Sequence, residues 1–188
     1  MRRLLLPLLT ALLLSACAAP RPLPSGDSLP ARGDVREFAL AGRFSLTHEG
    51  ERHSGRIDWR HRAQADEIEI VSPFGQIVAE IRFDAVAARL RTADGELREA
   101  ATPDLLLAEV LGYPLPVERL RGWVLARPRS EARVEADAAG RPRELVDTGW
   151  RIAYDYDDSA AGALPSRLIA TRDGGPELRL RIETWRMP

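Results

Sequence analysis

The chain has 188 residues, with 28 acidic side chains, 27 arginines, no lysine and a formal net charge of −1. A mildly acidic chain with scattered arginines gives no reason to expect a nucleic-acid-binding protein. The single cysteine, Cys17, excludes an intrachain disulfide, so the fold must depend on its hydrophobic core.

The N-terminus has the pattern of an export leader. Two arginines near the start precede an apolar run over residues 4–14, which is too short for a transmembrane helix of roughly 20 residues. Residues 14–17 (LSAC) resemble the bacterial lipobox, which implies cleavage before Cys17 and attachment of a diacylglycerol to its thiol. The alternative is an ordinary secretory signal whose cleavage motif happens to contain a cysteine.

Three segments follow from this pattern. Residues 1–16 are the expected lipoprotein signal peptide, and residues 17–34 are the lipidated cysteine with a proline-rich tether, because prolines favour extended backbone. Residues 35–188 are the expected folded domain. Two or three acyl chains on Cys17 would make a stable anchor. In the lipoproteins that this lipobox resembles, an aspartate after the cysteine retains the protein at the inner membrane. Ala18 stands at that position here, so the resemblance implies the periplasmic face of the outer membrane.

The first part of the domain alternates apolar and polar residues, which is the period of a half-buried strand. Such strands are expected over residues 38–47, 56–60, 68–71, 77–83, 86–90 and around Leu97. Gly42 interrupts the first of them and indicates a bulge or a tight bend.

The pattern then changes to helical spacing. Thr102 and Pro103 read as an N-cap followed by proline at the first helical position, and Gly112 as a stop. A second short helical turn is expected from Val117 to Val124, ended by residues 127–128 (RP). Because the two helices interrupt a chain of strands, we expect them to form a lid over a sheet.

Strands resume after the helices. Alternation is clear at residues 150–156 and 178–182, with shorter candidates around Val134, Leu145 and Leu168. About ten short strands at this spacing predict a curved antiparallel sheet or barrel.

No catalytic constellation stands out, and we expect no enzyme, no cofactor and no metal site. His48, His53 and His61 have no cysteine or carboxylate at metal-ligand spacing. The chain lacks the nucleophile-elbow, phosphate-loop and zinc-protease motifs. Asp155 and Asp157 flank alternating tyrosines and read as a solvated face.

Phe74 is unusual because it lies at the tip of a turn, between Pro73 and Gly75, where polar residues are the rule. It either folds back onto the core or protrudes toward a membrane or an acyl chain. Burial of one phenylalanine is favourable by about 1.5–3 kcal/mol, which helps a tethered protein touch a bilayer without anchoring it.

The apolar residues of the concave side of the predicted sheet, with two from the first helix, either fill a core or line a cavity for an apolar ligand. The candidates for a cavity lining are Phe38, Leu40, Phe44, Leu46, Ile57, Trp59, Ile68, Ile70, Leu106, Val110, Trp150, Ile152 and Tyr154.

Together these motifs resemble the LolB family, the outer-membrane lipoprotein receptors of the Lol sorting pathway. The matching stretches cover nearly all of the chain after Cys17, in order: residues 38–44 (FALAGRF), 57–59 (IDW), 72–76 (SPFGQ), 111–117 (LGYPLPV), 120–123 (LRGW), 149–154 (GWRIAY), 164–165 (LP) and Trp185.

The resemblance implies a mainly β fold, an incomplete antiparallel β-barrel of about 11 strands with a helical lid over a hydrophobic cavity. It implies a monomer that accepts triacylated lipoproteins from a LolA-like periplasmic carrier and inserts them into outer-membrane lipid. The loop of Pro73, Phe74 and Gly75 looks like the family's membrane-insertion loop, which favours a protruding Phe74. The alternative function is a structural envelope lipoprotein that docks other proteins and has a filled core; an envelope hydrolase using unrecognised carboxylates is a further class.

Overall fold

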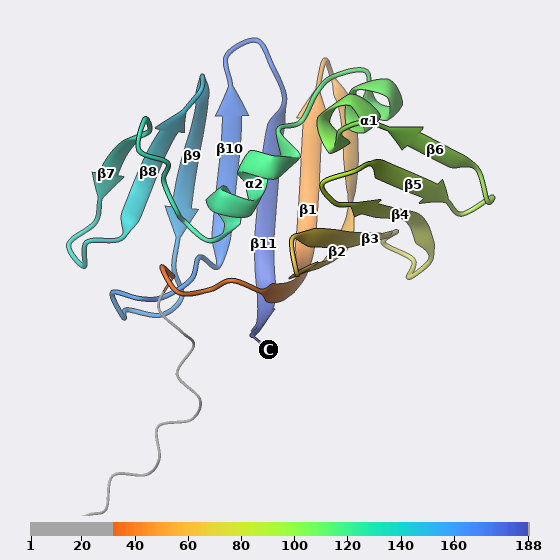
Figure 1. Cartoon of the computed structure of the whole chain (residues 1–188). Helices are drawn as coiled ribbons and strands as arrows, with labels where there is room; N and C mark the ends of the chain where they lie inside the picture. Colours follow the sequence, from red (N-terminus) through yellow and green to blue (C-terminus); the bar gives the residue numbers. More distant parts are fainter. Residues whose placement is uncertain (1–31, 188) are drawn as a thin grey trace, which may run out of the picture.

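The structure, a computed structural model, describes residues 32–187, in which eleven strands and two helices form (Figure 1). The helices are α1 (Pro103–Leu111) and α2 (Val117–Val124), and both follow the sixth strand. The strands are β1 (Phe38–His48), β2 (Glu51–Arg62), β3 (Ala65–Val71), β4 (Ile77–Phe83), β5 (Ala88–Thr92), β6 (Leu97–Ala100), β7 (Arg133–Ala136), β8 (Pro142–Asp147), β9 (Trp150–Asp155), β10 (Arg167–Arg172) and β11 (Glu177–Arg186).

All described strands belong to one antiparallel sheet, in the order β6-β5-β4-β3-β2-β1-β11-β10-β9-β8-β7. The first and last strands pair at its centre, where Phe44 lies opposite Leu180. β6 and β7 are the edges and do not pair with each other, so the curved sheet stays open. Both helices lie against its concave face (Figure 1). The expected mainly β fold with an incomplete antiparallel barrel and a helical lid is confirmed.

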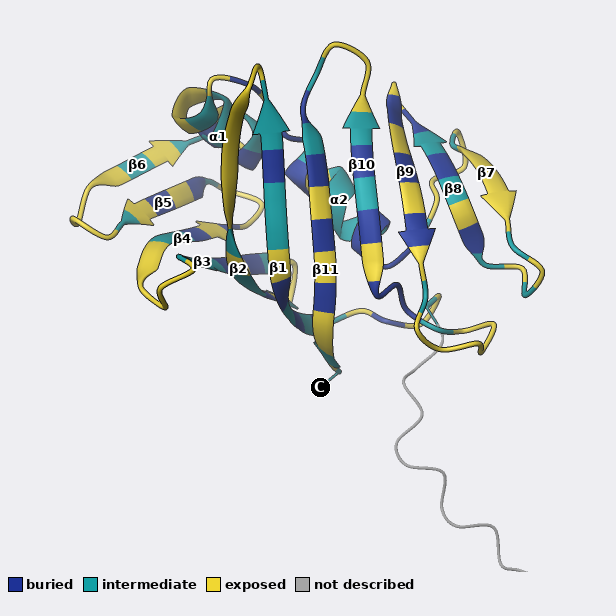
Figure 2. Ribbon diagram, turned by 180° about the vertical axis from the view of Figure 1, so that it is seen from behind, coloured by how far each residue is buried: buried dark blue, intermediate teal, exposed yellow. Residues whose placement is uncertain are grey.

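Alternation along each strand separates the two faces of the sheet. In β9, Trp150, Ile152 and Tyr154 are buried and the residues between them are exposed, and β11 repeats the pattern. Figure 2 shows this banding from the convex side. Successive strand residues point to opposite faces, so the polar set faces solvent while the apolar set faces the helices.

Two glycines allow the sheet to bend near its centre. The register between β1 and β11 shifts at Gly42, as expected for a bulge, and a Cβ there would lie 2.1 Å from the carbonyl oxygen of Arg181. A Cβ on Gly55 of β2 would lie 2.5 Å from the carbonyl oxygen of Val71. Only glycine fits these close approaches of two backbones.

The helix ends follow local sequence signals. Thr102 caps α1 by accepting a hydrogen bond from the Leu105 amide at 3.3 Å, and Gly112 ends the helix with φ of 80°. α2 ends at Val124, before the expected stop at residues 127–128, because the chain leaves helical geometry at Ala126, where φ is 48°. Val86 was expected in a strand but precedes β5 and is 81% exposed.

Candidate functional site

An apolar cavity of about 480 Å³ lies between the concave face of the sheet and the helices. Strands β1 to β5 and β11 form its floor, and both helices form its roof. Its lining residues are Phe44, Leu46, Arg52, His53, Ser54, Ile57, Trp59, Ile68, Ile70, Val78, Ala79, Ile81, Leu90, Leu107, Val110, Leu111, Leu115, Val117, Leu120, Leu178 and Leu180.

The structure brings seven of the thirteen candidate lining residues to this cavity: Phe44, Leu46, Ile57, Trp59, Ile68, Ile70 and Val110. The other six do not line it. They are Phe38, Leu40, Leu106, Trp150, Ile152 and Tyr154, and each is at most 6% exposed within the packed core.

The cause of this difference is helix α2. Its Trp123 packs on Trp150 of β9, with ring centroids 5.5 Å apart, and fills the concave face over β8 to β10. Phe38 packs at the end of the sheet against the edges of Trp59 and Trp185, at 5.5 and 5.8 Å between centroids. Leu106 lies on the buried side of α1 and is itself fully buried. These positions belong to a filled core, and we do not include them in the ligand site.

The sequence prediction missed apolar lining residues that share the same periodicity. Ile81 on β4, Leu178 and Leu180 on β11, and Leu107 and Leu111 on α1 all face the cavity. The alternation in β4 and β11 and the helical spacing of α1 were visible. Which strands face the cavity, however, depends on the pairing of β1 with β11, which joins the two ends of the chain.

A β-bulge brings one more side chain to the rim. Between β3 and β4, Ile70 pairs with Ala79 and Val71 pairs with Ile77, so Val78 is an extra residue. Val78 lines the cavity beside Ala79 and is still 39% exposed, as is Val110 on α1. Both valines therefore lie where the cavity meets solvent.

The polar part of the lining comes from the start of β2. Strand β3 pairs with β2 only from Arg56 onward, so residues 51–55 have β1 on one side and no strand partner on the other. Arg52, His53 and Ser54 in this segment line the cavity and are exposed. The cavity thus has an apolar interior and a polar margin.

Phe74 lies at the tip of the loop between β3 and β4, directly before the exposed Ile77 and Val78. It is 93% exposed, so the folded-back position is excluded. The loop is a tight turn, in which the Gly75 amide donates to the Ser72 carbonyl at 2.9 Å and Gly75 has φ of 85°. This turn directs the Phe74 ring away from the core.

Two buried carboxylates hold α2 across the sheet. On β3, Asp66 accepts a hydrogen bond from Trp59 Nε1 at 2.6 Å, and its other oxygen lies 3.1 Å from Arg121 Nε of α2. Burial raises the pKa of Asp66, against the hydrogen bond from Trp59 and the charge of Arg121. His61 Nδ1 lies 3.1 Å from Asp66 Oδ1, the oxygen that accepts from Trp59.

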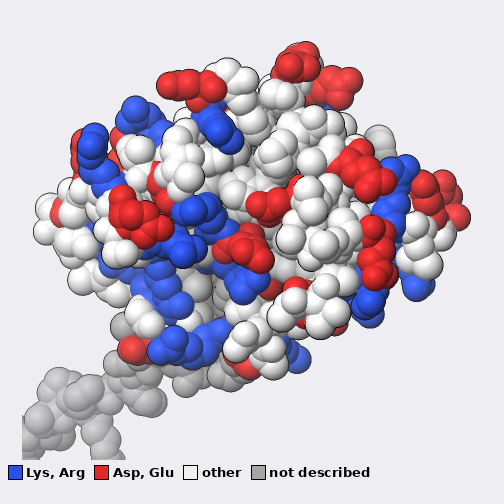
Figure 3. Space-filling model, turned by 45° about the horizontal axis from the view of Figure 1, so that its top comes forward, with Lys and Arg blue, Asp and Glu red and all other residues white. Residues whose placement is uncertain are grey.

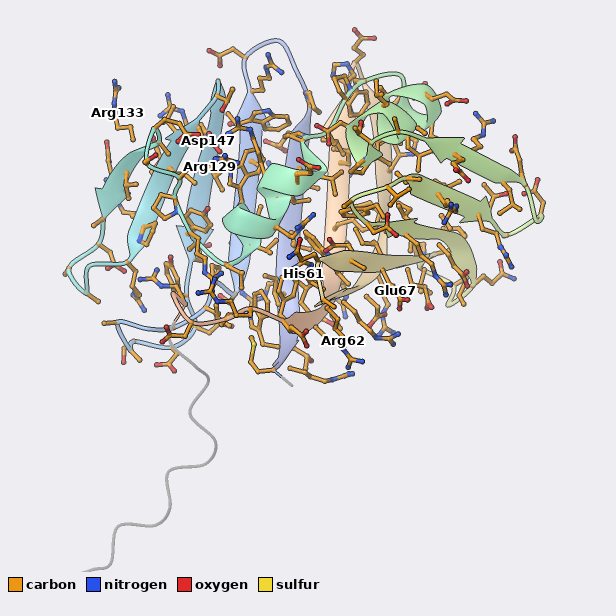
Figure 4. The ribbon with its side chains drawn as sticks, in the orientation of Figure 1. His61, Arg62, Glu67, Arg129, Arg133 and Asp147 are labelled. Atoms are coloured by element: carbon orange, nitrogen blue, oxygen red, sulfur yellow. The ribbon has the colours of Figure 1, made fainter. Side chains whose placement is uncertain are left out.

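A second buried carboxylate, Asp147 at the end of β8, contacts α2 in a similar way. Asp147 accepts hydrogen bonds from Arg119 Nη1 at 2.7 Å and Trp123 Nε1 at 2.9 Å, both from α2. Burial alone would raise the pKa of Asp147, but the hydrogen bonds from Trp123, Thr148 and Arg119 outweigh it and hold the pKa below its usual value. Figure 4 shows His61 and Asp147 on either side of α2. The helix is therefore held from both sides, by β3 through Arg121 and by β8 through Arg119 and Trp123.

Cys17, the signal peptide over residues 1–16 and most of the tether lie outside the described residues. Within residues 32–187, no three His, Cys, Asp or Glu side chains are close enough together to hold a metal ion. Over the same residues, no helix has the length and apolar character to cross a membrane. Charges are interleaved over the face seen in Figure 3.

An open, curved antiparallel sheet whose helices roof an apolar cavity is the architecture of a protein that binds an apolar ligand. The particular family follows from sequence comparison. The family model described as outer membrane lipoprotein LolB matches residues 36–185, and the chain belongs to this family.

Individual relatives agree with the family model. The chain is 42% identical to an outer-membrane lipoprotein LolB of Dechloromonas aromatica (strain RCB), over 95% of each chain. It is 40% identical to one of Azoarcus sp. (strain BH72), over 93% of this chain and 90% of the relative. Among solved structures, the LolA superfamily protein NE2245 from Nitrosomonas europaea aligns with a TM-score of 0.49 and 11% identity, over 81% of this chain and 86% of that one. The family assignment rests on the sequence matches.

Proposed function

We propose that this protein is a lipid-anchored outer-membrane lipoprotein that accepts lipoproteins from a periplasmic carrier and inserts them into the outer membrane. The observation that carries the proposal is the apolar cavity of about 480 Å³. Its size lies within the range of roughly 300–1,000 Å³ that is usual for small-ligand sites. Membership of the LolB family supports the same role.

The energetic need for such a cavity is large. Moving a 16-carbon acyl chain out of a bilayer into water is unfavourable by about 0.8 kcal/mol per CH₂, or on the order of 12 kcal/mol per chain. A cavity lined by Phe44, Ile57 and Ile70 removes most of this cost. Transfer then needs only a downhill order of acyl affinity, from the carrier to this protein and on to the bilayer. No covalent bond is made or broken in this relay.

The Phe74 loop supplies the contact with the membrane in this proposal. One phenylalanine contributes about 1.5–3 kcal/mol on leaving water, which brings the domain to the bilayer but does not anchor it. The anchor is the acylated Cys17. The loop leads directly into Ile77 and Val78, and Val78 is on the rim of the cavity. An acyl chain leaving the cavity there meets the loop that touches the membrane.

The alternative of a structural docking lipoprotein predicts a filled core over the whole concave face. The structure fills that face only under α2, over β8 to β10, and leaves the space over β1 to β5 open. This observation favours the receptor.

The first experiment asks which protein holds the cargo. The chain with Cys17→Ala is mixed with its cognate carrier loaded with a triacylated lipoprotein, and each protein is pulled down. We expect the cargo on this protein. Val110→Glu, on the cavity wall, should leave the cargo on the carrier, whereas Leu105→Glu, on the same helix but outside the cavity, should not. Cargo that stays on the carrier with the Cys17→Ala chain would refute the receptor role.

The second experiment separates acceptance from insertion. Phe74→Glu should still take cargo from the carrier but should fail to place it in liposomes, because a charged tip cannot enter the apolar layer. Val86→Glu is the matched control, since Val86 is also an exposed apolar residue in a turn, 81% exposed against 93% for Phe74. Equal insertion by Phe74→Glu and the wild type would remove the loop from the mechanism.

A further inference from the structure

A second cavity, of about 400 Å³, lies at the end of the sheet where the described chain enters the domain. It shares no lining residue with the apolar cavity. Three arginines from separate parts of the chain line it: Arg36 before β1, Arg121 on α2 and Arg127 after α2. We refer to it as the arginine cavity. In Figure 3, arginine side chains gather near the start of the described chain, at the lower left.

The guanidinium groups of the three arginines retain N–H donors that no described residue accepts. Arg121 turns its Nε toward Asp66, and its two Nη groups have no hydrogen-bond acceptor among residues 32–187. Arg127 donates from Nε and Nη2 to the backbone carbonyls of Arg32 and Val35, which leaves Nη1. Arg36 is exposed and has no ion pair within the described part of the chain.

Several acceptors around the cavity already accept hydrogen bonds. At the end of α2, the Gly122 carbonyl accepts from the Arg127 amide at 2.8 Å, and the Trp123 carbonyl accepts from the Ala126 amide at 2.9 Å. Glu37, the carboxylate in the lining, accepts from the Ala63 amide at 3.1 Å. The arginine donors of the wall remain open to a ligand.

The arginines differ in how far carboxylates neutralise them. Glu37 is in the lining and Asp66 lies 3.1 Å from Arg121 Nε, whereas Arg36 has no ion pair among the described residues. Burial, and then the nearby charge of Arg36, lower the pKa of Arg127, and the charge of Asp34 offsets part of this effect. An anion bound between Arg36 and Arg127 would reduce the repulsion between these two cations.

We propose that the arginine cavity is a binding site for a phosphate group. Arginine suits phosphate because its planar fork donates two parallel hydrogen bonds to a tetrahedral anion. The phosphate is either that of a lipid headgroup or a free anion. The lipid source rests on the proposed anchor at Cys17. A tether over residues 17–34 holds this end of the domain within about 60 Å of the bilayer, at 3.3–3.6 Å per residue.

The test measures binding of inorganic phosphate to the full chain with Cys17→Ala by isothermal titration calorimetry. Arg36→Gln removes one charge-assisted contact without breaking an ion pair, so it should weaken binding by about tenfold or more. Arg62→Gln is the matched control, because Arg62 is also an exposed arginine near His61 but does not line the cavity (Figure 4). It should bind phosphate like the parent chain. Absence of saturable binding, or an equal loss in both variants, would overturn the proposal.

A second measurement identifies the source of the phosphate and does not involve lipoprotein transfer. The same three proteins are sedimented with vesicles of phosphatidylglycerol and with vesicles of a galactolipid, which has no phosphate. Stronger binding to phosphatidylglycerol, reduced by Arg36→Gln and not by Arg62→Gln, would support a lipid headgroup. Saturable phosphate binding with no preference between the vesicles would support a free anion. Because neither measurement uses the carrier or cargo, failure here would leave the receptor role standing.

Discussion

The two halves of the concave face differ in how they are covered. Under α2, the strands β8 to β10 form a filled half, in which Leu145, Ile152 and Leu168 are at most 1% exposed. Under α1 and the apolar side of α2 formed by Val117 and Leu120, the strands β1 to β5 form a hollow half, in which Phe44 and Ile57 are only partly buried around the cavity. Both halves are built from the same alternating strands.

The helices explain the difference. Helix α2 packs a tryptophan against the sheet, and Asp66 of β3 and Asp147 of β8 contact its arginines. α1 brings leucines and a valine, and its surface ion pair, Arg98 with Glu109 at 3.5 Å, contributes little to stability. A large side chain fixed by a buried hydrogen bond fills one half, and the smaller side chains of α1 leave the other half open.

The largest contrast is expected from one substitution made in both halves. Ile152→Ala in the filled half should cost about 2–5 kcal/mol, because it leaves a cavity in a packed core. Ile57→Ala in the hollow half should cost about 1 kcal/mol, because its side chain is only partly removed from water. Urea unfolding of both variants measures the difference. Equal losses would mean that the hollow half is packed as tightly as the filled half in solution.

A ligand should act on the hollow half alone. Palmitate at 100 times its dissociation constant should raise the free energy of unfolding by about 2.7 kcal/mol. The gain should persist in Ile152→Ala, whose substitution lies outside the cavity, and should vanish in Ile57→Trp, whose larger side chain occupies it. Thermal unfolding with and without palmitate measures both. A gain retained by Ile57→Trp would place the ligand elsewhere.

The two buried carboxylates should give opposite pH dependences. The pKa of Asp147 is lowered by folding, so its contribution is present above the unfolded pKa and is lost as the pH falls through the folded pKa. The pKa of Asp66 is raised by burial, so stability falls as the pH rises from the unfolded pKa through the folded pKa.

Amide substitutions separate these contributions. Asp147→Asn should cost about 1.5–3 kcal/mol at neutral pH, since it weakens hydrogen bonds to a charged group, and should reduce the loss of stability in acid. Asp66→Asn should instead reduce the loss as the pH is raised. The free energy of unfolding of each variant is measured from acidic to neutral pH. If it changed with pH in the same way in both variants, the opposite roles of Asp66 and Asp147 would be contradicted.

The smallest effect is expected at the cap of α1. Thr102→Ala removes the hydrogen bond to the Leu105 amide and should cost about 1 kcal/mol, mostly as faster hydrogen exchange within α1. Ser130→Ala, which removes a surface contact with Glu131, is the control and should leave α1 unchanged. Equal exchange in both variants would show that α1 is held by packing and not by its cap.

Local sequence patterns were sufficient to predict the strands and helices. Alternation predicted the strands, Thr102, Pro103 and Gly112 predicted the ends of α1, and Gly42 predicted the bulge in β1. The motifs from residue 38 to Trp185 were sufficient to predict the family. These features depend on residues close together in the chain, so their physical cause can be read from the sequence.

The tertiary structure decided which apolar residues surround empty space. Alternation shows that Ile57 and Ile152 both face the concave side, but only the position of α2 shows that Ile152 is covered and Ile57 is not. It also decided that Phe74 protrudes. Asp66 with Arg121, and the three arginines of the second cavity, come together from distant segments. A sequence pattern records the face on which a side chain lies, whereas packing determines what lies against that face.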